Sequence, residues 1–211
     1  MSPFLSAEAA LGRFAGRLRA RARRERPQRP ERLLLIACHW VGDSLWATQV
    51  LAPLAERYGR DALWVAAPAR TACLWRAQLP AARVLVLEHV ISDRRRESWS
   101  PAGFLAEVLD VRRLEFDAVV DLTGNRFSAL LAASLGAWCC GPDTHPWARL
   151  YDVATPSPPS VAGAPEHLAC RPFRAALPLL GALPKDLQPT PPPCAAELGA
   201  RVRARLGLAP G

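Results

Sequence analysis

One acidic residue stands where it could take a proton from a bound hydroxyl group. The triplet Gly42-Asp43-Ser44 closes a polar stretch that follows the apolar run Leu33–Ala37. A carboxylate placed beside a bound hydroxyl can act as a general base in a transfer reaction. Asp is also favoured at a helix N-cap, where the positive end of the helix attracts negative charge. Asp43 could therefore project into a ligand crevice at the strand end, with a helix cap as the structural alternative.

Arginines form a second group of candidates, because guanidinium groups bind phosphate and carboxylate through paired hydrogen bonds. We predict anion-binding roles for Arg70, Arg126 and the run Arg94, Arg95 and Arg96. The alternative for the run is a solvated group of charges, which is a common use of such stretches.

Smaller polar residues complete the candidate site. Gly42 would permit a tight turn or the close approach of a ligand to the backbone. His39 and His145 could orient hydroxyl groups of a ligand, although an isolated histidine more often has a structural role. Two further binding candidates are Thr123 and Asn125. We interpret Asp121 as a structural carboxylate at a strand end.

The pattern of the chain predicts an α/β fold, a Rossmann-like doubly wound parallel sheet, because apolar runs alternate with helical periodicity. The predicted strands are Leu33–Ala37, Ala62–Ala66, Val84–Leu87, Ala118–Leu122 and a short Trp138–Cys140. The predicted helices between and after them are Ser44–Tyr58, Thr71–Leu79, Pro101–Arg113, Arg126–Leu135 and His167–Gly181, the last doubtful as a straight helix because of Pro172 and Pro178. A final helix is predicted near the C-terminal end.

Ligands of open parallel sheets bind at the carboxyl ends of the strands. The loops that we expect there hold the candidates described above: Cys38–Asp43, Ala67–Thr71, Glu88–Ser98, Thr123–Arg126 and Gly141–Trp147. The sequence contains no G-x-G-x-x-G fingerprint and no G-x-x-x-x-G-K-[ST] loop, so neither the dehydrogenase nor the P-loop mode of phosphate binding is supported.

Cysteine spacing argues against a zinc site. The six cysteines are scattered, and no C-x-x-C pair has a partner pair at zinc-site spacing. Cys139 and Cys140 should point to opposite sides of a strand. We predict reduced packing thiols, no metal and no cofactor.

The basic balance of the chain predicts an anionic partner. The 27 Lys and Arg residues outnumber the 19 Asp and Glu residues, for a net charge of +8 over 211 residues. Residues 7–24 carry Leu11, Phe14, Leu18 and Ala22 at helical spacing among arginines. This segment predicts a basic amphipathic helix that either adsorbs to an anionic inner-membrane surface or remains a solvated extension. With no apolar run long enough to cross a bilayer and no secretory signal, we expect a cytoplasmic protein, peripheral on the inner membrane if the first alternative holds.

Three stretches together resemble a known family. LLLIACHWVGDSLWATQVLAPLAERYG, FDAVVDLTGNRFSALLAASLGAWCCGPD and EHLACRPFRAALPLLGAL follow each other in the order and spacing of glycosyltransferase family 9, the ADP-heptose:lipopolysaccharide heptosyltransferases. The resemblance spans about residues 32–187. It departs from the family at Thr48, which is followed by Gln49 where the family usually has Pro.

The resemblance implies the N-terminal, acceptor-binding half of a GT-B fold. It implies a heptosyltransferase-like enzyme in lipopolysaccharide biosynthesis, in which Asp43 deprotonates the inner-core acceptor as sugar is transferred, with inversion, from ADP-heptose or another nucleotide sugar. The arginines would then bind phosphate or carboxylate groups of that acceptor.

We expect three segments and an incomplete enzyme. Residues 1–31 are predicted to form the basic extension and linker, 32–187 the Rossmann-like domain, and 188–211 a Pro-rich segment and terminal helix that lead to an absent donor-binding domain. The isolated chain should therefore transfer no sugar. A non-catalytic remnant or membrane- or acceptor-binding module of the same fold is the alternative. A nucleic-acid-binding domain is disfavoured, because the aromatic residues do not interleave with the basic run.

Overall fold

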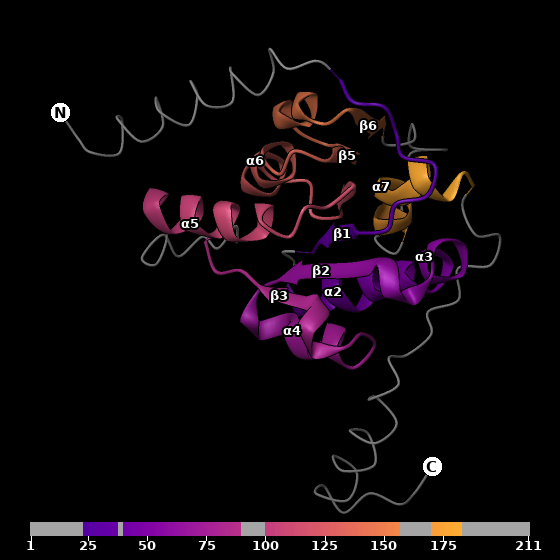
Figure 1. The fold of residues 1–211 in the computed structure, drawn as a ribbon, viewed down its shortest axis with the longest axis horizontal. Helices are drawn as coiled ribbons and strands as arrows, with labels where there is room; N and C mark the ends of the chain where they lie inside the picture. Colours follow the sequence, from indigo (N-terminus) through magenta and orange to yellow (C-terminus); the bar gives the residue numbers. More distant parts are fainter. Residues whose placement is uncertain (1–22, 38–39, 90–99, 157–169, 183–211) are drawn as a thin grey trace, which may run out of the picture.

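A six-stranded parallel sheet forms the centre of the protein. The structure is a computed structural model, and it describes residues 23–37, 40–89, 100–156 and 170–182. The strand order is β3-β2-β1-β4-β5-β6 (Figure 1). The strands are β1 (Leu33–Ile36), β2 (Leu63–Ala67), β3 (Val84–Val86), β4 (Ala118–Asp121), β5 (Trp138–Asp143) and β6 (Val153–Pro156). This order confirms the predicted doubly wound sheet, in which the direction of winding reverses between β1 and β4.

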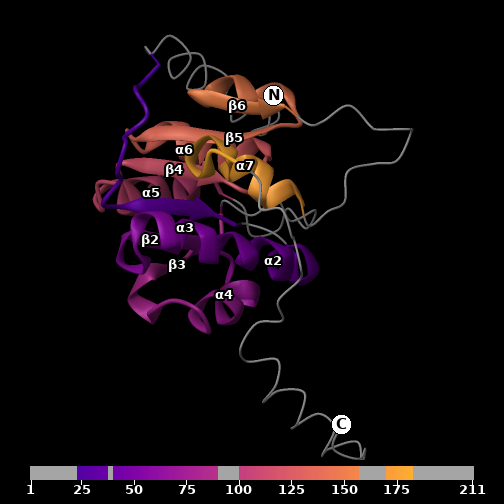
Figure 2. The same cartoon turned by 90° about the vertical axis from the view of Figure 1, so that its right-hand side faces the viewer.

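Helices cover both faces of the sheet, and the alternation of side chains along β1 shows why. Leu33 and Leu35 pack on one face, whereas Leu34 and Ile36 pack on the other. The first face carries α2 (Val41–Ala47), α3 (Leu51–Tyr58), α4 (Ala69–Arg76) and α7 (Cys170–Leu180), which lie nearer the viewer in Figure 2. The second face carries α5 (Pro101–Arg112), α6 (Arg126–Ser134) and the 3-10 helix η4 (Pro146–Leu150).

The sheet has one strand more than the sequence pattern predicts. The short fifth strand extends to Asp143, and β6 pairs with it in parallel from Cys140 opposite Val153 onward. Only Thr155 of β6 is buried, so this edge strand lacks the continuous apolar run by which the central strands are found.

The helix predicted over Ser44–Tyr58 begins earlier and is divided. It starts at Val41 as α2, passes through the 3-10 helix η1 (Thr48–Val50) and continues as α3. Ser44 resembles a helix start, but its side chain is buried inside α2. The division leaves one apolar face, including Val50, Leu51 and Leu54, against the sheet.

The segment around Pro178, which the sequence leaves doubtful as a straight helix, is helical in the structure. Although Pro178 lies inside α7, the helix continues to Leu180, because Phe173, Ala176 and Leu179 bury one face against the sheet. Pro172 is in the first turn, where a backbone N–H has no partner within the helix. Residues 167–169 of the predicted helix lie outside the described residues. So do 1–22 and 183–211, and the predicted domain boundaries stay predictions.

Candidate active site

The candidate site lies where β1 and β4 run side by side. Ile36 pairs with Ala66 of β2 on one side and with Asp121 of β4 on the other. The chain leaves β1 toward α2 on one face and leaves β4 toward α6 on the opposite face. The loops that follow these strands therefore flank the point at which ligands of doubly wound sheets bind.

Asp43 is an exposed residue of the first turn of α2. The N-cap of this helix is Trp40, whose side chain makes no capping hydrogen bond, so the structural alternative of an Asp43 cap is wrong. Among the described side chains, none forms a hydrogen bond or ion pair with the Asp43 carboxylate. This carboxylate faces solvent at the carboxyl edge of the sheet, as a base that receives a proton from a bound ligand must.

Gly42 is part of the same helical turn. It does not have the positive φ of a tight turn, so the predicted turn is wrong. Apart from its two chain neighbours and the backbone of the same helix, no atom lies within 4 Å of the position that a Cβ would occupy. The open space leaves room for a ligand beside the backbone, and this role of Gly42 stays a prediction.

Exposed apolar side chains lie in the same segment as Asp43. Trp40 is 57% exposed, Val41 48% and Leu45 36%. The guanidinium carbon of Arg70, from the first turn of α4, lies 4.5 Å from the centroid of the Trp40 ring. This cation–π contact joins the loop after β1 to the loop after β2 and holds a positive charge at the rim.

On the β4 side, a buried carboxylate organises the loop. Asp121 is fully buried, and its Oδ1 accepts hydrogen bonds from the backbone N–H groups of Thr123 (2.8 Å) and Gly124 (3.0 Å). The Tyr151 hydroxyl donates to Oδ2 at 2.6 Å. Burial raises the pKa of Asp121, and hydrogen bonds, that from Ser128 first, partly oppose this increase. Asp121 is thus a structural carboxylate, as the sequence indicates.

Thr123 and Asn125 are held by their own chain. The Thr123 hydroxyl donates to the carbonyl of Ile36 at the end of β1 (3.2 Å). Asn125 caps α6, with its side-chain oxygen accepting from the N–H groups of Phe127 and Ser128. The capping interaction occupies N–H groups that an anion would otherwise bind. The Asn125 Nδ2 is buried and has no hydrogen-bond partner, which keeps a ligand contact open to this residue.

Arg126 and His145 meet through an aromatic residue. The Arg126 guanidinium carbon lies 5.4 Å from the Phe127 ring centroid and 5.3 Å from that of Trp147. His145 caps η4, because its Nδ1 accepts from the N–H of Trp147 at 3.0 Å. Burial lowers the pKa of His145, and nearby Asp143 partly opposes this, so the imidazole is neutral at pH 7.

Four candidate residues and one cavity are not part of the site described above. His39, Arg94, Arg95 and Arg96 lie outside the described residues. A cavity of about 190 Å³ is lined by residues such as Leu51, Arg60 and Leu63, near the amino end of β2 and away from the candidate site.

In the described ranges, no group of three His, Cys, Asp or Glu side chains is placed to hold a metal ion. Cys139 and Cys140 pack on opposite faces of the sheet, as predicted. Within the same ranges, no helix has the length and apolar character needed to cross a bilayer.

Sequence reasoning missed two features of the site. It did not identify Tyr151, because a lone aromatic 30 positions from Asp121 carries no local signal. It also did not identify the contact of Trp40 with Arg70 or that of Trp147 with Arg126. The sequence does place these tryptophans and arginines in the loops expected at one edge of the sheet, and this placement could have indicated that they contact each other.

Comparisons with known proteins agree with this fold. No family model matches the chain, and no curated protein sequence matches it significantly. The chain is similar to the solved structure of the E. coli heptosyltransferase WaaC with ADP-2-deoxy-2-fluoro heptose, at 21% identity and a TM-score of 0.58, covering 74% of this chain and 50% of that one.

Two other solved structures are similar. One is the glycosyl transferase family 9 protein from Veillonella parvula, at 14% identity and a TM-score of 0.54, covering 85% of this chain and 50% of that one. The other is E. coli ADP-heptose lipopolysaccharide heptosyltransferase II, at 18% identity and a TM-score of 0.54, covering 84% and 51%. The chain thus has a glycosyltransferase-like α/β fold and spans about half the length of the structures that it matches.

Proposed function

We propose that this chain is the acceptor-binding half of a heptosyltransferase-like enzyme that acts on the lipopolysaccharide inner core. The observation that carries the proposal is the exposed Asp43 carboxylate at the reversal point of a sheet that resembles those of heptosyltransferases. In this role Asp43 takes the proton from the acceptor hydroxyl as the hydroxyl oxygen attacks the anomeric carbon of the nucleotide sugar. The bond between the anomeric carbon and the diphosphate oxygen breaks at the same time, and the nucleoside diphosphate leaves from a second domain that holds the donor.

Two arginines fixed by aromatic rings support an anionic acceptor. Arg70 stacks on Trp40, and Arg126 contacts Phe127 and Trp147. Stacking restricts each long side chain before a ligand arrives, which lowers the entropy cost of binding. Because the two arginines project from loops on either side of β1, they can contact two separate phosphate or carboxylate groups of one acceptor.

Acceptor binding by the isolated chain tests the proposal. Titration with deacylated lipopolysaccharide inner core should show saturable binding that Arg70→Ala and Arg126→Ala each weaken about tenfold, as expected when one charge-assisted contact is lost. Arg83→Ala is the matched control, because Arg83 lies 5.7 Å from the Trp64 ring at the opposite edge of the sheet. Equal loss in all three variants would show a nonspecific charge effect and would contradict the proposed site.

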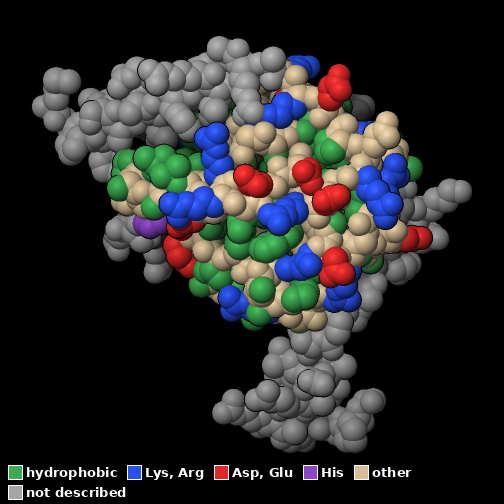
Figure 3. Space-filling view, viewed as in Figure 1, with side chains coloured by type: hydrophobic (Ala, Val, Ile, Leu, Met, Phe, Trp, Pro, Cys, Tyr) green, Lys and Arg blue, Asp and Glu red, His purple; other side chains and the backbone are tan. Residues whose placement is uncertain are grey.

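A binding module without transfer activity is the second candidate. It would have the same fold and the same acceptor contacts, without the transfer step. The two candidates predict the same acceptor binding. They differ in whether substitution of Asp43 lowers the turnover of the nucleotide sugar once a donor-binding domain is supplied. Nucleic acid is a weaker candidate, because on the face seen in Figure 3 basic and acidic side chains alternate and do not form a continuous basic patch.

A cytoplasmic location, with anionic lipid contacted by the arginines of residues 13–21, fits this function. Sedimentation with vesicles that contain or lack phosphatidylglycerol tests the membrane contact. Equal recovery with both kinds of vesicle would remove it.

A further inference from the structure

The chain has two tyrosines, and both are buried and bonded to a distant segment. The Tyr58 hydroxyl donates to the carbonyl of Leu179 at 2.8 Å, on the sheet face that carries α7. The Tyr151 hydroxyl donates to Asp121 at 2.6 Å, on the opposite face. Of the two bonds, that of Tyr151 reaches the candidate site, because Asp121 is the last residue of β4.

The Tyr151 side chain crosses β5 at a glycine. Cys140 pairs with Val120, which places Gly141 beside Asp121 of the neighbouring strand. A Cβ atom at Gly141 would lie 2.6 Å from Cζ of the Tyr151 ring, closer than non-bonded carbon atoms pack. The ring therefore lies directly on the backbone of Gly141, a close approach that a residue without a side chain permits.

Asp121 also fixes the loop that carries Arg126. Its Oδ1 accepts hydrogen bonds from the N–H groups of Thr123 and Gly124. The Ser128 side chain, in the first turn of α6, bonds to the same carboxyl group. Arg126 lies between these bonded residues at the start of α6. Asp121 is thus a common anchor for the chain on both sides of Arg126 and for the residue that follows η4.

The helix η4 holds an aromatic ring against Arg126. It packs on α6, and its Trp147 ring centroid lies 5.3 Å from the Arg126 guanidinium carbon. A 3-10 helix of five residues has weak internal hydrogen bonds, so its position depends on contacts outside it. Tyr151 directly follows η4 and supplies such a contact. The contact joins η4 to the same carboxyl group that holds the Arg126 loop.

The loops after β4 and β5 also touch each other. A Cβ atom at Gly124 would overlap Cγ of Pro142 and would lie 3.1 Å from Oγ1 of Thr144. Closely packed segments transmit small displacements to one another. A shift of η4 would therefore also reach the loop that carries Arg126.

We propose that Tyr151 and Gly141 are positioning residues for acceptor binding: the Tyr151 hydroxyl, bonded to Asp121, holds η4 so that Trp147 stays against Arg126. This inference rests on the proposed function and deepens it. Tyr151 is buried and acts through Arg126, which Trp147 restricts before the acceptor arrives. A restricted side chain loses less entropy on binding, so loss of the Tyr151 hydroxyl should weaken binding although it removes no charge.

A double-mutant cycle tests the coupling. In the full chain, Tyr151→Phe should raise the dissociation constant for deacylated inner core about fivefold, but less than about 1.5-fold when Arg126 is already replaced by Ala. In the Arg70→Ala background the loss should remain about fivefold, because Arg70 lies on α4, away from η4.

Tyr58→Phe is the matched control. It removes a buried tyrosine hydrogen bond on the other face of the sheet. It should lower the unfolding free energy as Tyr151→Phe does and leave inner-core binding unchanged. Gly141→Ala is a second variant, because the added methyl group displaces the Tyr151 ring, and it should weaken binding as Tyr151→Phe does. If Gly141→Ala does not fold, the two tyrosine variants decide the question.

Hydrogen exchange without ligand separates this inference from the proposed function. The amides of Trp147 and Ala148 bond to His145 within η4. Tyr151→Phe should accelerate their exchange at least about tenfold, whereas Tyr58→Phe should not. Unchanged exchange would overturn the inference alone. Accelerated exchange in a chain whose native form binds no inner core would overturn the proposed function and leave Tyr151 as the residue that places Trp147.

Two further results would overturn the positioning role. Tyr151→Phe and Tyr58→Phe could weaken inner-core binding equally, which would indicate a general loss of stability. Tyr151→Phe could also weaken binding by the same factor with and without Arg126, which would show that its effect does not pass through that arginine.

Discussion

Asp43 is an exposed residue in the first turn of α2, at the carboxyl edge of the sheet. In the proposed reaction its carboxylate must reach the acceptor hydroxyl, because a general base acts within hydrogen-bond distance of the proton that it removes.

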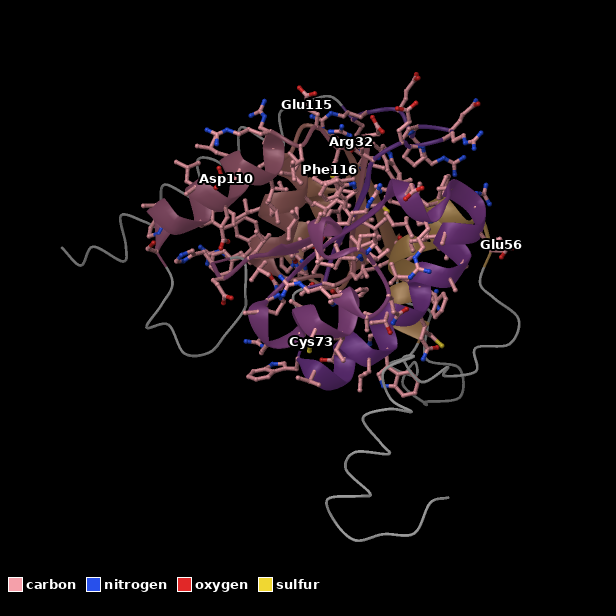
Figure 4. All side chains as sticks on the ribbon, turned by 60° about the horizontal axis from the view of Figure 1, so that its bottom comes forward. Arg32, Glu56, Cys73, Asp110, Glu115 and Phe116 are labelled. Carbon is pink, nitrogen blue, oxygen red and sulfur yellow. The ribbon has the colours of Figure 1, made fainter. Side chains whose placement is uncertain are left out.

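Replacement of the Asp43 carboxylate by an amide tests the base directly. With the donor-binding domain supplied on a second polypeptide, Asp43→Asn should lower the turnover of ADP-heptose about a hundredfold or more, while acceptor binding changes less than about twofold. Glu56→Gln is the control, since Glu56 is an exposed carboxylate on α3 (Figure 4). Undiminished turnover by Asp43→Asn would contradict the role of Asp43 as the base, and no turnover by either chain would favour the non-catalytic module.

The buried Asp121 predicts a pH dependence of stability. Its pKa is raised from 3.8 by burial, so the native state holds the proton to a higher pH than the unfolded chain does. The contribution of this group is therefore fully present at low pH and is lost as pH rises through the native pKa. Asp121→Asn should remove this decrease, because the amide oxygen can still accept from Thr123 and Gly124.

Urea unfolding between pH 4 and 7 measures the effect. The difference in unfolding free energy between Asp121→Asn and the native chain should increase in favour of the variant as pH rises. Asp61→Asn, at an exposed carboxylate, controls for the change in net charge. A difference that is constant with pH would contradict the buried, proton-binding state of Asp121.

At the scale of elements, replacement of two helix glycines by alanine should change the unfolding free energy in opposite directions. Gly42 has a helical backbone in α2 and open space around its Cβ position. Gly59 ends α3 with a φ of 88°, a region that side chains rarely adopt. Gly42→Ala should raise the unfolding free energy by about 0.5–1 kcal/mol, and Gly59→Ala should lower it by about 1 kcal/mol.

Thermal or urea unfolding of the two variants provides the measurement, and each variant serves as the control for the other. If a ligand approaches the backbone at Gly42, then Gly42→Ala should also weaken acceptor binding despite its greater stability. Destabilisation by Gly42→Ala would show that α2 does not start at Val41.

The elements differ in how well the sequence predicts them. β1 and β4 are found because strands buried on both faces must be continuously apolar. β6 is missed because it is an edge strand with a single buried residue. The start of α2 is missed because Ser44 has the chemistry of a cap but is buried within the helix. Contacts between distant segments, such as Asp121 with Tyr151 or Trp40 with Arg70, depend on the assembled fold and leave no periodic signal.

At the scale of the molecule, this chain resembles about half of each solved structure that it matches. If a second domain holds the nucleotide sugar, as proposed, these 211 residues alone should bind inner-core acceptor but should transfer no heptose from ADP-heptose. Product analysis after incubation with both substrates is the measurement. A positive control reaction uses the same substrates with a complete heptosyltransferase, and turnover by the chain alone would contradict the need for a donor-binding domain.

The reactivity of the cysteine thiols can report the order in which the layers of this molecule separate during unfolding. Cys73 is exposed on α4 (Figure 4), whereas Cys139 and Cys140 are buried on opposite faces of β5. Burial raises the pKa of Cys139 to about 12 and that of Cys140 well above its ordinary value. An alkylating reagent should therefore modify Cys73 at once. The order in which the two neighbouring thiols become reactive would then show whether the α6 layer or the α7 layer separates first from the sheet.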